Sequence, residues 1–127
     1  MERRNSKIKV VVVKPEEYPQ VVVIEDVNTW FNGEYIQIPA YTQDTVILAP
    51  EQKEGLILNR GLYDPGQTQM RQIVAGDFLL CGVSEDGGFR SLTDQEVYLY
   101  LERFRQPEKF ITAGNVIFCV PFHKGIS

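Results

Sequence analysis

Two valine-rich runs near the start of the chain constrain its fold more than any other feature. They are "KIKVVVVKP" at 7–15 and "PQVVVIED" at 19–26, joined through the turn-like residues "EEYP". Branched side chains favour extended backbone, and two such runs around a short polar turn are typical of an antiparallel hairpin. Other apolar segments of strand length lie at 35–38, 46–49, 56–59, 73–83 and 115–122. The pattern predicts six to eight short strands.

One segment, "SLTDQEVYLYLERFRQP" at 91–107, is predicted to form the main helix over about 93–105. Thr93 and Glu96 stand three residues apart, which is the spacing of a capping box at a helix start. Val97, Leu101 and Phe104 follow at i, i+4 and i+7, so they share one helical face. Strands outnumber helices and do not alternate with them. The fold class is therefore α+β, a mostly antiparallel sheet with this helix packed on it.

Two local predictions accompany this outline. Residues 27–33, "VNTWFNG", are expected to form one short helical turn capped by Asn28. The charged, glycine-containing segment "PEQKEG" at 50–55 is expected to be the loop of a hairpin between the strands on either side of it.

The length of 127 residues indicates a single domain over 1–127, with residues 1–6 as a flexible basic arm. Residues 1–9 hold four basic residues and one acidic residue, a net charge of +3, so the other 118 residues carry −7 of the total of −4. An acidic body repels phosphate, and direct nucleic-acid binding is not expected. The longest apolar runs have five residues, far below the ~20 of a membrane span. We expect a soluble cytoplasmic protein.

Several segments, in order, resemble a known family. "GEYIQI", "ILAPEQKEGLILNR", "IVAGDFLLCG" and "FRSLTDQEVYLYLERF" together are similar to the domain-of-unknown-function family 3846, over about residues 8–105. The resemblance implies a setting in phages, plasmids and conjugative elements. It assigns no catalytic or binding residue.

The polar pair Asn59–Arg60, in "LILNRG", is the most distinctive candidate site. Asparagine ends a strand well and Gly61 lets the chain turn, so a turn between strands is one interpretation. The other is an anion-binding or partner-binding arginine, since a guanidinium presents five donors suited to a carboxylate or phosphate. Arg71 and Arg90 lie in or beside other loops and are candidates to converge with Arg60.

The sequence gives little evidence for catalysis, phosphate binding or metal binding. The only histidine, His123, follows "VPF" near the end of the sequence, and no phosphate-binding glycine motif occurs. Cys81 and Cys119 both lie in apolar runs and are expected to be buried, reduced thiols. We expect no catalytic residue, no metal site and no cofactor.

The sequence therefore favours a non-enzymatic binding protein of a phage or mobile element. Its most specific form is a counter-defence inhibitor that acts on a host protein, such as a restriction enzyme, a CRISPR nuclease or an immune-signalling protein. The alternative is a small-ligand protein that sequesters a nucleotide with its loop arginines. The oligomeric state stays open, a homodimer included.

Overall fold

The computed structural model describes residues 7–31, 33–66 and 69–122. The basic arm at 1–6 and His123 lie outside the described residues. The elements, in chain order, are β1 (Ile8–Val13), β2 (Gln20–Ile24), α1 (Val27–Phe31), β3 (Tyr35–Pro39), β4 (Thr45–Pro50), β5 (Leu58–Tyr63), β6 (Met70–Ala75), β7 (Phe78–Val83), β8 (Phe89–Arg90), α2 (Asp94–Arg103), β9 (Glu108–Ala113) and β10 (Val116–Pro121).

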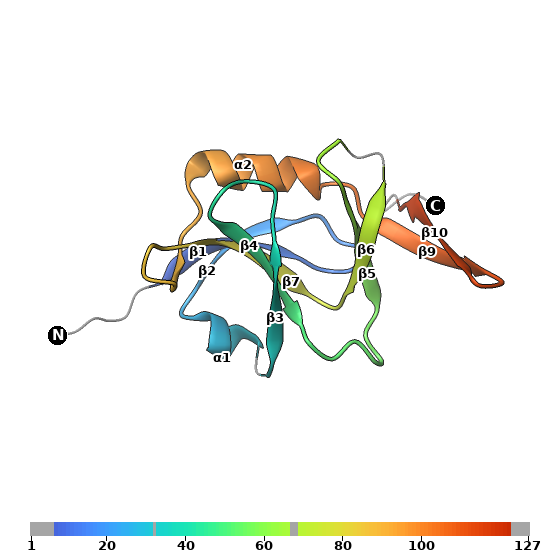
Figure 1. Cartoon of the computed structure of the whole chain (residues 1–127), viewed down its shortest axis with the longest axis horizontal. Helices are drawn as coiled ribbons and strands as arrows, with labels where there is room; N and C mark the ends of the chain where they lie inside the picture. Colours follow the sequence, from blue (N-terminus) through green and yellow to red (C-terminus); the bar gives the residue numbers. More distant parts are fainter. Residues whose placement is uncertain (1–6, 32, 67–68, 123–127) are drawn as a thin grey trace.

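A central antiparallel sheet organises the fold, with strands in the order β2-β1-β7-β4-β3 and β8 paired to β7 (Figure 1). The predicted hairpin of the two valine-rich runs is confirmed as β1–β2, with Val10 opposite Val22. On its other side, β1 pairs with β7. Five of the six β1 residues are buried because the strand is covered on both faces, which is why its sequence is a nearly continuous apolar run.

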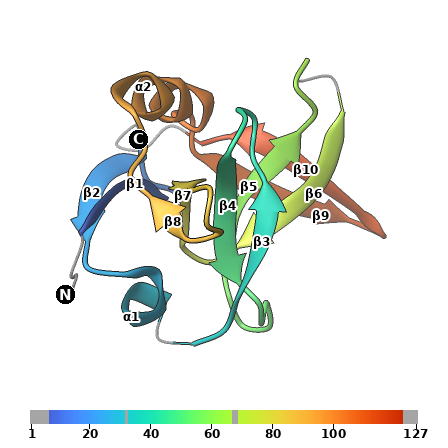
Figure 2. The same cartoon turned by 60° about the vertical axis from the view of Figure 1, so that its left-hand side comes forward.

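The central sheet separates two hydrophobic clusters. Val11 and Val13 belong to the cluster that also contains Tyr100 and Phe104 from the α2 segment. Val10 and Val12 point the other way, into a cluster that α1 closes with Val27. Figure 2 shows α2 and α1 on opposite sides of the sheet. Because successive side chains of β1 point to opposite faces of the sheet, this one strand contributes residues to both hydrophobic clusters.

The α+β class with mostly antiparallel pairing is confirmed, and the described residues form ten strands rather than six to eight. One reason is that 73–83, expected as one strand, is interrupted at Gly76, whose φ is +77°. The chain there leaves β6 and enters β7, which belongs to another sheet. A second reason is β9, which the sequence interpretation missed.

The expected hairpin around residues 50–55 is wrong. β4 already has β3 and β7 as neighbours, whereas β5 pairs with β6 in a separate two-stranded sheet. The segment that follows β4 therefore connects two sheets. Leu56 and Ile57, expected in a strand, lie in this connection and are exposed.

The two helices differ in how well the sequence predicted them. In α1 the cap is Asp26 instead of Asn28, since the Thr29 amide donates to Asp26 Oδ1 at 2.9 Å. In α2 the capping box is confirmed: the Glu96 amide donates to Thr93 Oγ1 at 3.1 Å, and the Thr93 amide donates to Glu96 Oε1 at 2.9 Å.

The apolar face of α2 packs on the sheet as predicted, but its residues are buried to different extents. Val97 and Leu101 are only partly buried, while Phe104 is 4% exposed. Tyr100, between Val97 and Leu101 in the sequence, is fully buried.

Candidate functional site

Asn59 and Arg60 lie inside β5 and not in a turn, so the turn interpretation is wrong. Their exposed fractions are 0% and 1%. The pairing of β5 with β6 shifts register between Leu58 and Arg60, which marks a β-bulge at Asn59. A bulge re-aims side chains, and here it accompanies the burial of two consecutive polar residues. Asn59 Nδ2 donates to the carbonyls of Val13 at 3.0 Å and Gly76 at 2.8 Å.

The Arg60 guanidinium joins three parts of the chain. Nη2 donates to the carbonyls of Glu17 at 2.7 Å and Phe104 at 2.9 Å, and Nε also donates to Phe104. Nη1 donates to Asn59 Oδ1 at 2.9 Å. The carbonyl of Phe104 is at the C-terminal cap of α2, where backbone acceptors have no partner within the helix. Arg60 therefore caps α2 and ties it to the β1–β2 turn.

Burial lowers the pKa of Arg60 to about 10, partly opposed by the negative charge of Glu108. The side chain still carries its charge at neutral pH. Because all three guanidinium nitrogens donate to protein oxygens, the geometry favours a structural role over anion or partner binding.

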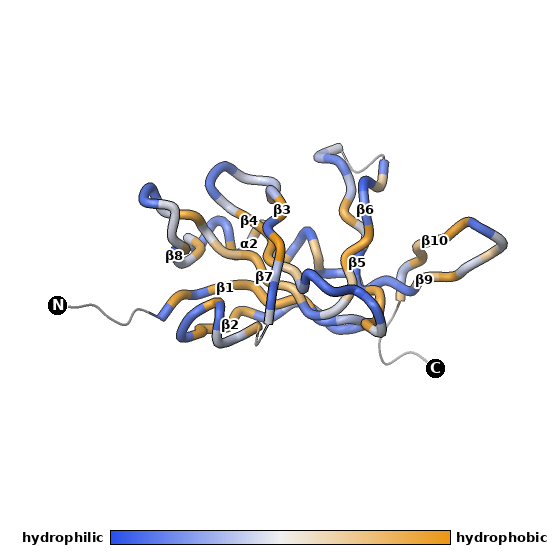
Figure 3. Tube along the Cα trace, turned by 60° about the horizontal axis from the view of Figure 1, so that its bottom comes forward, coloured by the Kyte–Doolittle hydropathy of each residue, from blue (hydrophilic) through white to orange (hydrophobic). Residues whose placement is uncertain are grey.

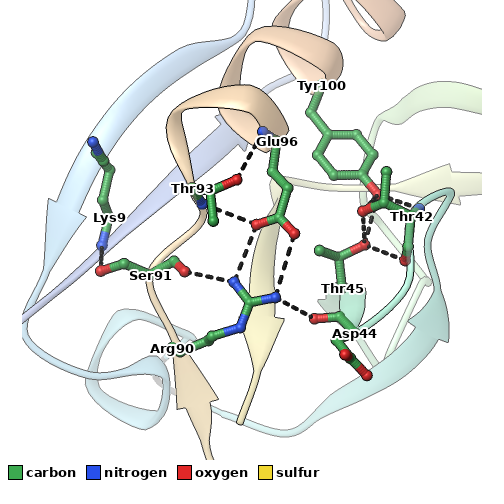
Figure 4. Close-up of polar contacts among 9 residues, drawn as sticks. All are labelled: Lys9, Thr42, Asp44, Thr45, Arg90, Ser91, Thr93, Glu96 and Tyr100. Carbon is green, nitrogen blue, oxygen red and sulfur yellow. Dashed lines mark hydrogen bonds and ion pairs between the residues drawn. The ribbon is translucent and has the colours of Figure 1, made fainter.

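Arg90 is in β8, and Figure 4 shows its side chain directed toward Glu96 of α2. It donates to both carboxylate oxygens of Glu96, at 3.1 Å and 3.3 Å, and to the carbonyls of Ser91 and Asp44. Burial by itself would raise the pKa of Glu96, but the hydrogen bonds from Arg90 and Thr93 outweigh it and leave that pKa lowered. Arg90 thus stabilises the carboxylate of the capping box.

Arg71 is exposed on β6, with Cζ 5.8 Å from the centre of the Tyr41 ring. Arg103 stacks on the same ring at 3.6 Å. Arg103, Tyr41 and Arg60 line one small enclosed cavity of about 120 Å³. This volume is well below the ~300–1,000 Å³ of small-molecule pockets, so the cavity is too small for a nucleotide. Neither Arg71 nor Arg90 lines this cavity, so it does not support the predicted convergence of Arg60, Arg71 and Arg90 on one ligand.

Tyr100 is a polar anchor that the sequence interpretation missed. Its hydroxyl accepts hydrogen bonds from the amides of Tyr41 and Thr42, both at 2.9 Å, and lies 2.7 Å from Thr45 Oγ1 (Figure 4). The signal was present, because Tyr100 is three residues after Val97 and so falls on the predicted apolar face.

The two cysteines have different surroundings. Cys81 is buried in β7 as predicted, whereas Cys119 on β10 is only partly buried. Both are free. Burial raises the pKa of Cys81 to about 12 and that of Cys119 to about 11. Both thiols are therefore protonated and weakly nucleophilic at neutral pH.

The clearest candidate for an interaction surface is the hairpin of β9 and β10, which projects from the body (Figure 1). Phe118 lies opposite Ile111, and Val116 lies two residues from Phe118 on the same face. Their exposed fractions are 51%, 52% and 52%. Ile117, on the other face, is 41% exposed. Figure 3 shows hydrophobic residues along both strands.

The base of this hairpin is anchored. Glu108 Oε1 accepts a hydrogen bond of 2.7 Å from the Gly61 amide of β5, and the Phe122 amide donates to the Pro107 carbonyl at 2.7 Å. The exposed apolar residues are thus held on a strand pair that is fixed to the body at one end. We call Ile111, Val116 and Phe118 the hairpin face.

In residues 7–31, 33–66 and 69–122, no three His, Cys, Asp or Glu side chains are grouped so that they could hold a metal ion. In the same part of the chain, no helix has the length and apolarity to cross a membrane.

Comparison with known proteins gives one positive result. Neither the curated proteins nor the solved structures contain a match to this chain. One family model, described as Domain of unknown function (DUF3846), matches residues 8–105 and leaves the hairpin of β9 and β10 outside. Because the matched residues are well over half of the chain, the protein belongs to the DUF3846 family.

Proposed function

We propose that this protein is a non-enzymatic binding protein of a phage or other mobile genetic element, and that it acts by contacting a host protein. The hairpin face is the observation that carries this proposal. Soluble domains seldom expose contiguous apolar patches unless another molecule covers them. Three large apolar side chains, each about half exposed, lie together on one face of a projecting strand pair.

The composition of the hairpin face also supports a protein partner. Phe118 lies at its centre, between Ile111 across the strand pair and Val116 along β10. Aromatic residues are enriched at the centres of protein–protein interfaces, where they bury a large area at little cost in conformational entropy.

The charge of the chain supports the counter-defence form of the proposal. Beyond residue 9 the net charge is −7, which disfavours direct contact with DNA. The same charge attracts the basic groove of a host nuclease and speeds the encounter. The nucleotide-binding alternative has less support, because Arg60 already donates to Glu17, Asn59 and Phe104.

The test is retention of a host protein by immobilised wild-type protein and by two double variants. Ile111→Ser with Phe118→Ser removes the centre of the hairpin face. The matched control is Val23→Ser with Tyr98→Ser, because those side chains are 59% and 68% exposed elsewhere. We expect wild type and control to retain the same host protein from lysate, and the hairpin variant to lose it.

Two further measurements make the result decisive. Retention should fall as salt rises, because screening shortens the reach of surface charge. Thermal melts should show all three proteins folded. Equal retention by the hairpin variant, or tight binding of bare duplex DNA at physiological salt, would refute the proposal.

A further inference from the structure

A second surface, separate from the hairpin face, is a groove of about 760 Å³ beside α1. Trp30 and Phe31 of α1 line it together with Leu56 and Ile57 of the segment that connects β4 to β5. Ile57 is 64% exposed and Leu56 is 40% exposed. We call these four residues the groove walls.

The groove walls are held in place by packing. Trp30 meets Phe31 edge to face, with ring centres 4.8 Å apart, and Phe31 stacks on Tyr35 at 5.0 Å. On the other side, a Cβ at Gly76 would lie 2.9 Å from Leu56 Cδ1, so the glycine lets Leu56 rest against the backbone. The apolar surface is therefore preorganised, which lowers the entropic cost of binding.

Acidic residues predominate among the charged residues of this groove and of a second hollow on the same connection. A second hollow, of about 740 Å³, is lined by residues 51–54 of the same connection and by Glu34. The charged residues that line the two hollows are Lys14, Glu17, Glu34, Glu51, Lys53, Glu54 and Asp77. Five acids and two bases give a net charge of −3.

We propose that the groove binds a segment of a partner protein that carries apolar side chains between lysines or arginines. The groove walls require apolar side chains, since they leave aliphatic and aromatic surface in water. The acids that line the groove and the second hollow select a basic segment and repel anionic ligands such as nucleotides.

Trp30 provides a direct readout, because it is the only tryptophan of the chain. The probe is a short synthetic peptide of leucine and lysine with leucines on one helical face. Its comparison is a peptide of the same pattern with glutamate in place of lysine. We expect the lysine peptide to shift Trp30 emission saturably, with an affinity that falls as salt rises, and the glutamate peptide to leave it unchanged.

Two double variants test which residues carry the binding. Leu56→Ser with Ile57→Ser should weaken the lysine peptide about tenfold or more, as expected when central apolar contacts are lost. Val23→Ser with Tyr98→Ser is the control and should bind as wild type does. The hairpin variant should also bind the peptide normally, so that failure at the groove and failure at the hairpin face are read separately.

Three outcomes would overturn the inference. The first is no change in Trp30 emission with the lysine peptide, and the second is equal binding of the glutamate peptide. The third is self-association in sedimentation velocity that Leu56→Ser with Ile57→Ser abolishes, because the occupant would then be a second copy of this chain.

Discussion

Replacing Tyr100 by phenylalanine removes one oxygen atom and leaves the packing of the ring intact. That oxygen accepts from the amides of Tyr41 and Thr42 and lies 2.7 Å from Thr45 Oγ1. It therefore connects α2 to the segment between β3 and β4. The Tyr100→Phe variant tests whether this polar anchor stabilises the fold beyond the burial of the ring.

The expected loss of unfolding free energy follows from the groups left without partners. Two backbone amides lose their acceptor, at about 1–3 kcal/mol each, and these amides are only partly buried, which favours the lower end. The lost bond to Thr45 adds about 0.5–1.5 kcal/mol. We expect a total of about 2–4 kcal/mol.

Urea unfolding followed by circular dichroism measures this loss. With an m-value of about 2 kcal/mol per molar, the midpoint should fall by about 1–2 M at unchanged m. Tyr98→Phe is the matched control, since Tyr98 is on the same helix but 68% exposed, and it should change stability by less than about 0.5 kcal/mol. If both variants unfold at the same midpoint, the reasoning about the Tyr100 hydroxyl is wrong.

Three other predictions concern Arg60, the two cysteines and Glu96. Arg60→Met should lower the unfolding free energy by about 3–5 kcal/mol in the same assay, because the carbonyls of Glu17 and Phe104 lose a charged donor. A loss below about 1 kcal/mol would contradict the capping role of Arg60. Cys81 and Cys119 should react slowly with a bulky thiol reagent at neutral pH and quickly in urea, because burial raises both pKa values; rapid labelling of native Cys81 would show that β7 is not buried. The lowered pKa of Glu96 means that its stabilising contribution is present above its unfolded value of 4.5 and lost as pH falls through the folded value. Glu96→Gln should therefore flatten the pH dependence of stability between about pH 5 and pH 3, and an unchanged profile would argue against the ion pair with Arg90.

The predictions that succeeded from sequence concern contacts between near neighbours. The capping box of α2 needs only Thr93 and Glu96, three residues apart, and the β1–β2 hairpin needs only two β-favouring runs and a short turn. The missed strand β9 also had a local signal, since Gly114, with φ of +64°, lies in the turn between it and the predicted strand at 115–122. The glycine and the apolar residues on both sides of it are local features, so the sequence is sufficient to predict β9.

Other predictions failed because the deciding contacts are distant in sequence. Asn59 and Arg60 resemble a strand end followed by a glycine turn, and the local residues do not exclude it. Their carbonyl partners include Val13, 46 residues from Asn59, and Phe104, 44 residues from Arg60. Residues 50–55 also resemble a hairpin loop, but β4 already pairs on one edge with β3, the strand before it, and on the other edge with β7 from much later in the chain.

The sequence by itself determined the α+β class and the main helix. It also determined the run of apolar residues in β1, whose side chains alternate between the two hydrophobic clusters. It determined these because helix capping and strand propensity act over a few residues. Only the tertiary structure decided that Arg60 is buried as a cap for α2 while Ile111, Phe118 and Ile57 remain exposed. Burial depends on which segments meet in space, and no pattern of neighbouring residues specifies that meeting.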